Sequence, residues 1–137
     1  MQQLSLLEQD GRPRHRYFFG VHVESAAAAR IAEATRRWRA EHRLSGVPIP
    51  AERLHVTLHH LGDYDAERGG LAATAIEAMN GLEMAPFEVG FDRTMSFWGK
   101  QSMPFVLCGS AELSGIAALQ RALGLSMAKA GVGKWVE

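Results

Sequence analysis

The stretch Arg53-Leu54-His55-Val56-Thr57-Leu58-His59-His60-Leu61-Gly62 decides how this chain is interpreted. Apolar and polar residues alternate along it, so residues 53–61 are predicted to form a strand, which Gly62-Asp63 ends. Successive side chains of a strand point to opposite faces. We therefore expect a polar face, lining a cleft or solvent, made of His55, Thr57 and His59. The other face is expected to pack on the core and consists of Leu54, Val56, Leu58 and His60.

Strands and helices are predicted on both sides of this stretch. An aromatic and β-branched run predicts a strand over residues 16–23, central in a sheet. A helix is expected from an N-cap at Ser25 to about His42, followed by a Gly- and Pro-containing loop over 44–50. Its inward stripe, at three-to-four spacing, comprises Ala28, Ile31, Ala32, Thr35 and Trp38.

The second half of the chain predicts two more helices and two more strands. Helices are expected over 66–81, capped by Asp65, and over 111–130, ended by Gly131. The predicted strands are 86–95 and the short apolar run 105–108. The inward residues of the first helix are Leu71, Ala75, Ile76 and Met79, and those of the second are Leu113, Ile116, Leu119, Leu123 and Met127.

Composition bounds the class of protein. The 137 residues suit one domain, and 47% hydrophobic with 22% charged residues at zero net charge excludes a disordered chain and a strongly basic nucleic-acid coat. The single cysteine, Cys108, excludes an internal disulfide framework and fits a cytoplasmic location. No apolar run approaches the roughly 20 residues of a membrane helix. Residues 1–14 are predicted to be a flexible polar tail, and 15–137 the folded domain.

The pair His55 and Thr57 points to phosphate chemistry. Imidazole gains and loses protons near neutral pH, and a hydroxyl two residues on lies about 7 Å along the same strand face. The hydroxyl would donate to a phosphate oxygen while the imidazole moves a proton at the same phosphorus. The alternative is a polar strand face without function. Two residues beside Gly99, Phe97 and Trp98, are candidates for stacking a base, although packing is the commoner role of such aromatics.

The order of the segments along the chain also supports phosphate chemistry, because it is typical of one family. Arg16-Tyr17-Phe18-Phe19-Gly20-Val21, then a helix, then Leu54 to Gly62, resembles the 2H phosphoesterase superfamily. Within it, the bacterial 2′-5′ RNA ligase / RNA 2′,3′-cyclic phosphodiesterase (LigT-like) family is the most similar. The later pieces, Pro86-Phe87-Glu88, Phe97 and a helix ending at Gly131, follow in the family's order, so that the resemblance covers about residues 15–137.

The resemblance implies a bilobal α+β fold of antiparallel sheets flanked by helices, in which each lobe gives one His-x-Thr to a shared cleft. It also implies a reaction that needs no metal and no cofactor. One histidine acts as base on water, the other as acid on the leaving ribose oxygen, and the threonines bind the phosphate. On this basis His55 is catalytic, Thr57 binds phosphate, and the substrate is a 2′,3′-cyclic phosphate RNA end or a cyclic nucleotide.

The sequence departs from the family pattern in one respect. It holds a single His-x-Thr and no histidine after His60, whereas the family's second motif follows the last helix. The chain is therefore interpreted as a truncated member that lacks the C-terminal strands and is weakly active or inactive. Self-association through exposed sheet edges is also expected. Two alternatives remain open: a non-catalytic RNA- or nucleotide-binding module, and a small metal-dependent hydrolase using His55 and His59, for which no third ligand is evident.

Overall fold

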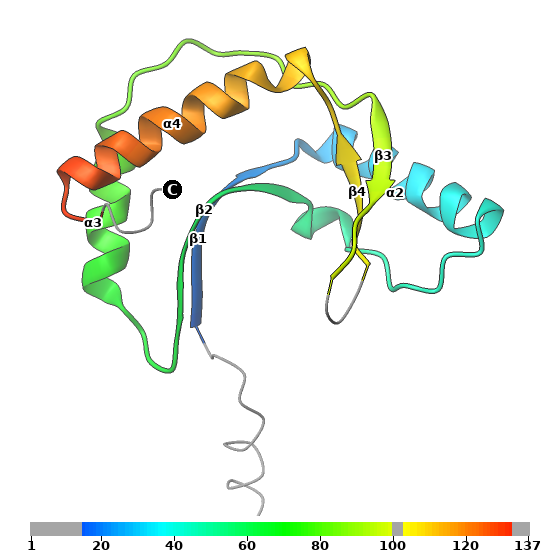
Figure 1. Ribbon diagram of the computed structural model, residues 1–137, viewed down its shortest axis with the longest axis horizontal. Coiled ribbons are helices and arrows are strands. Elements are labelled where there is room, and N and C mark those ends of the chain that lie inside the picture. The colour runs from blue at the N-terminus through cyan, green and yellow to red at the C-terminus, as the bar shows by residue number, and fades with distance from the viewer. Residues whose placement is uncertain (1–14, 100–102, 133–137) are drawn as a thin grey trace, which may run out of the picture. The chain divides into compact units, whose positions relative to one another are not determined.

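The computed structural model describes residues 15–99 and 103–132, and these form an α+β fold of three α-helices and two antiparallel two-stranded sheets (Figure 1). The predicted fold class is confirmed. The predicted tail, residues 1–14, lies outside the described residues. The elements are β1 (His15–His22), α2 (Ser25–Glu41), a 3₁₀ helix (Ala51–Arg53), β2 (His55–Tyr64), α3 (Gly69–Asn80), β3 (Arg93–Ser96), β4 (Phe105–Cys108), a second 3₁₀ helix (Ala111–Leu113) and α4 (Ser114–Lys129).

The chain divides into two compact units, Met1–Glu67 and Arg68–Glu137. In the first unit, β1 and β2 pair antiparallel (Figure 1). Helix α2 is capped by Glu24 and not by Ser25, because the longer carboxylate accepts from the backbone N–H groups of Ala26 and Ala27 at 3.0 and 3.2 Å. These two hydrogen bonds hold the pKa of Glu24 below its ordinary value. The predicted inward stripe of this helix is confirmed, with Ala28 buried and the other four residues half-buried.

Strand β2 extends past the predicted stop at Gly62-Asp63 and ends at Tyr64. Gly62 has φ +122°, a conformation that other residues rarely adopt. Glycine here acts as part of a bulge and not as a terminator, since the pairing with β1 continues beyond it. The Tyr64 hydroxyl donates to the Leu61 carbonyl at 3.0 Å, a hydrogen bond within this end of the strand.

In the second unit, α3 and α4 pack through small and apolar side chains, and Ser126 Oγ donates to the Ala78 carbonyl at 2.7 Å. The predicted face of α4 is confirmed. Helix α3 begins at Gly69, later than predicted, and Ile76 and Met79 are 50% and 43% exposed instead of inward. The small residues of α3 take their place and allow close approach of α4. The buried set is Ala75, Ala78, Leu123 and Met127.

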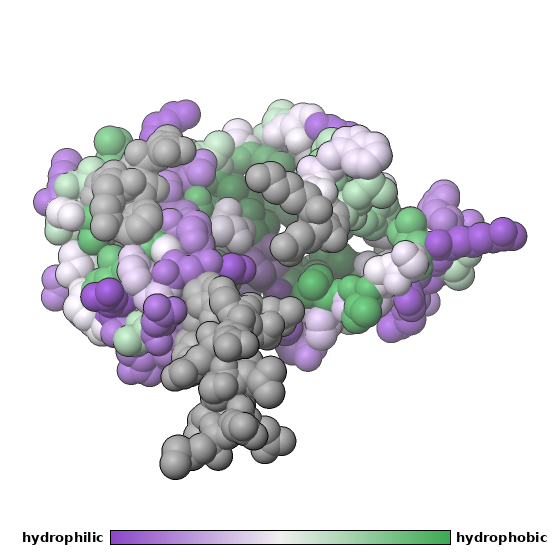
Figure 2. Space-filling view, turned by 60° about the horizontal axis from the view of Figure 1, so that its bottom comes forward, coloured by the Kyte–Doolittle hydropathy of each residue, from purple (hydrophilic) through white to green (hydrophobic). Residues whose placement is uncertain are grey.

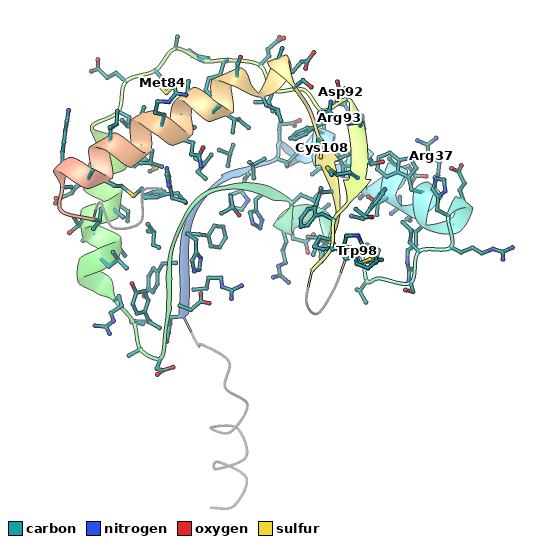
Figure 3. The ribbon with its side chains drawn as sticks, in the orientation of Figure 1. Arg37, Met84, Asp92, Arg93, Trp98 and Cys108 are labelled. Atoms are coloured by element: carbon teal, nitrogen blue, oxygen red, sulfur yellow. The ribbon has the colours of Figure 1, made fainter. Side chains whose placement is uncertain are left out.

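Strands β3 and β4 form a hairpin, and Arg93 fastens its open end by donating to the Ser110 hydroxyl at 2.9 Å and the Gly109 carbonyl at 3.2 Å. In Figure 3, Arg93 and Cys108 mark the paired ends of these strands. The strand predicted over 86–95 is only Arg93–Ser96. The preceding segment packs on the start of α4 instead, because the Phe87 ring lies directly against Gly115.

Large apolar side chains remain on the surface, and Figure 2 shows green apolar patches between purple hydrophilic residues on the face that it displays. Those of the hairpin are Met95, Phe97, Trp98, Met103 and Phe105. No helix in the described part of the chain is long and apolar enough to cross a membrane. The expectation of self-association stays a prediction.

Candidate active site

The β1–β2 register breaks the simple alternation of β2 in two places. Gly20 pairs with Thr57 while Phe19 pairs with His59, so Leu58 has no partner of its own. Leu61 is skipped in the same way, between the pairs Phe18–His60 and Tyr17–Gly62. Each extra residue is a β-bulge, which shifts every later side chain of the strand by one position relative to the partner strand.

The bulges sort the polar side chains of the strand differently from the period-two prediction. Residues paired directly across a ladder share a face. The first face is exposed throughout and carries the pairs His22–His55, Gly20–Thr57, Phe18–His60 and Arg16–Asp63. His55 and Thr57 thus share a face as predicted.

His59 does not join them, and this corrects the sequence interpretation. It pairs with Phe19 on the opposite face and is 7% exposed. Leu58 and Leu61, 8% and 3% exposed, are buried beside it. The physical reason is that the bulge sends Leu58 and His59 to the same side of the strand, which buries one more leucine. His60, predicted to face the core, takes the exposed position instead.

The imidazole of His55 is held in one orientation by the backbone. Its Nδ1 lies 2.7 Å from the Arg53 carbonyl oxygen. A carbonyl can only accept, so Nδ1 carries the hydrogen and Nε2 of the neutral ring is left as the acceptor. The 3₁₀ helix fixes that carbonyl, because Arg53 N–H donates to Pro50 O at 2.9 Å and Leu54 N–H donates to Ala51 O at 3.2 Å.

Phe18 packs against the same imidazole, a contact that sequence reasoning missed. The two ring centroids are 5.1 Å apart, with the planes tilted by 34°. Gly20 makes the contact possible, since a Cβ there would lie 3.2 Å from the Phe18 ring. The signal was present in the sequence, because alternation along residues 16–23 places Phe18 and Gly20 on one face.

The far end of this face is closed by an ion pair. Arg16 donates to both carboxylate oxygens of Asp63 at 2.7 and 2.8 Å. The hydrogen bond from Arg16 holds the pKa of Asp63 below its ordinary value, and Asp63 in turn raises that of Arg16. His60 Nε2 lies 3.6 Å from the same carboxylate. The Asp63 carboxylate is therefore paired with Arg16, at the end of the β1–β2 ladder opposite to His55.

The geometry does not support the alternative metal site. His55 and His59 lie on opposite faces of the sheet, so one ion cannot be ligated by both without rearranging the strand. Across residues 15–99 and 103–132, no group of three His, Cys, Asp or Glu side chains is placed to hold a metal ion.

The two candidate stacking residues lie in the second unit. Phe97 and Trp98 follow β3 and are 47% and 90% exposed. Trp98 is labelled at the loop end of the hairpin in Figure 3. Their role stays a prediction. Cys108 is half-buried at the end of β4, as its apolar strand suggests.

These features define a small α+β protein with an oriented imidazole and a hydroxyl on one open strand face. A comparison with family models identifies the family to which this protein belongs. The model described as "LigT like Phosphoesterase" matches residues 23–107, which is more than half of the chain and includes β2. The chain belongs to this phosphoesterase family. No curated protein and no solved structure matches it significantly.

Proposed function

We propose that the protein is a metal-independent phosphodiesterase that opens 2′,3′-cyclic phosphates at RNA ends or on nucleotides. The observation that carries the proposal is the fixed imidazole of His55. Its Nδ1–H is tied to the Arg53 carbonyl, which leaves Nε2 as a proton acceptor on the face shared with Thr57. Membership in the phosphoesterase family supports the reaction class.

In this scheme His55 Nε2 takes a proton from the attacking water, and the water oxygen forms the new bond to phosphorus. The bond from phosphorus to the 3′ oxygen breaks, and that oxygen takes up a proton from the solvent. The product is a 2′-phosphate beside a free 3′ hydroxyl. Thr57 donates its hydroxyl hydrogen to a non-bridging phosphate oxygen, where negative charge grows in the transition state.

The test is turnover of 2′,3′-cyclic AMP and of a short RNA with a 2′,3′-cyclic phosphate end, with products separated by chromatography. We expect a 2′-phosphate product, undiminished rates in EDTA, and a loss of about 100-fold or more in His55→Ala. Thr57→Val, which removes one donor and keeps the shape, is expected to lose about 10-fold or more.

His42→Ala is the matched control, because His42 is an exposed histidine at the end of α2 and is expected to leave the rate unchanged. Equal rates in His55→Ala and in the parent protein would refute the assignment. Binding of the nucleotide without turnover, lost in His55→Ala, would instead indicate the non-catalytic binding module.

A further inference from the structure

A second imidazole stands beside His55 on the other strand. His22, the last residue of β1, pairs directly with His55, the first residue of β2. Val23 N–H donates to Leu54 O at 3.4 Å, which makes Val23–Leu54 the hydrogen-bonded pair. The adjoining pair His22–His55 is then of the non-hydrogen-bonded kind, in which Cα atoms lie about 4.5 Å apart and side chains are closest.

The surroundings of His22 leave its ring available. It is exposed and on the same face as His55 and Thr57, and the Phe18 ring lies over the neighbouring Gly20 on that face. Among the residues that the structure describes, none holds the His22 ring by a hydrogen bond or an ion pair. A buried structural histidine would show the opposite features.

We propose that His22 binds the substrate phosphate, so that His22, His55 and Thr57 form one anion site across the two strands. This inference rests on the proposed function and adds a binding residue to it. In this arrangement an N–H of the His22 imidazolium donates a charge-assisted hydrogen bond to a non-bridging phosphate oxygen. His55 Nε2 stays free to accept the proton of water, because His22 supplies the positive charge.

The test follows the imidazole signals of the histidines by NMR while the full chain is titrated with inorganic phosphate and then with 2′,3′-cyclic AMP. His22→Gln and His55→Gln assign the two signals. We expect both to shift with the same apparent Kd, while the signal of the control His42 stays still. His22→Gln should weaken phosphate binding about 5- to 10-fold, and His22→Lys, which keeps a cation, should recover most of it.

The outcomes separate the two proposals. If the His55 signal shifts and the His22 signal does not, or if His22→Gln binds as tightly as the parent, the role of His22 is refuted while the proposed function stands. If the His22 signal shifts and the His55 signal does not, a single anion site that contains both histidines is refuted. If neither responds and no turnover occurs, both proposals fail. Unchanged backbone spectra of each variant show that the fold is retained.

Discussion

Replacing His55 by its two amide analogues separates the two nitrogens of the ring. The amide nitrogen of Asn occupies the position of Nδ1 and can still donate to the Arg53 carbonyl, 2.7 Å away in the native protein. The amide of Gln reaches the position of Nε2 but leaves that carbonyl without its donor. Neither amide takes up a proton near neutral pH.

The expected magnitudes differ for the two readouts. Because a positioned acid/base group contributes about 10²- to 10⁴-fold to the rate, both variants should lose activity in that range. A hydrogen bond contributes a net 0.5–1.5 kcal/mol, roughly, to the free energy of unfolding. Because His55 is exposed, its bond to the Arg53 carbonyl is expected in the lower half of that range. His55→Gln should therefore unfold about 2–4 °C lower than His55→Asn.

The assay pairs the hydrolysis of 2′,3′-cyclic AMP with thermal unfolding followed by circular dichroism. Activity within tenfold of the parent in either variant would remove the acid/base role. Equal melting temperatures of the two variants would show that the hydrogen bond to the Arg53 carbonyl does not orient the His55 ring.

Two further predictions concern the framework of the units. Gly115→Ala should lower the free energy of unfolding by about 1–3 kcal/mol despite its better helix propensity, because the new Cβ overlaps the Phe87 ring. The control Gly70→Ala, with open space around it, should be neutral or stabilising. Chemical denaturation compares the two variants, and a gain of stability in both would contradict the Phe87–Gly115 contact. The lowered pKa of Asp63 means that its pairing with Arg16 stabilises the fold fully above the ordinary value of 3.8 and that this contribution is lost as the pH falls through the lowered pKa. Asp63→Asn should therefore unfold at a lower temperature than the parent at pH 7, with a gap that narrows in acid, and a gap that widens there would disprove the assignment.

Much of the fold follows from local sequence patterns. The stripes of α2 and α4 repeat at helical spacing, so their inward faces were predicted correctly. Strand β1 was predicted from its own aromatic and β-branched residues, without knowledge of its partner strand. The family resemblance, carried by the residues from Arg16 to Gly62, is confirmed by the family match.

The errors have a common physical source, which is contact between segments distant in sequence. The bulges at Leu58 and Leu61 form because burial of leucine on one face outweighs a regular ladder, and nothing local to β2 announces this. The strand predicted over 86–95 is shortened because Phe87 packs on α4. The prediction that His55 and Thr57 share a face is confirmed, because both precede the first bulge.

The bulges also change how substitutions along β2 are tolerated. His59 and His60 are neighbours of identical chemistry, yet one is buried and the other is exposed. A library that varies both positions would find position 60 permissive to charge and position 59 restricted by volume and polarity. A deletion of one residue at Val56 would put the imidazole and the hydroxyl on opposite faces, whereas a deletion after Leu58 would leave both in place. The segment from His55 to Thr57 thus keeps its orientation when the strand changes length further along.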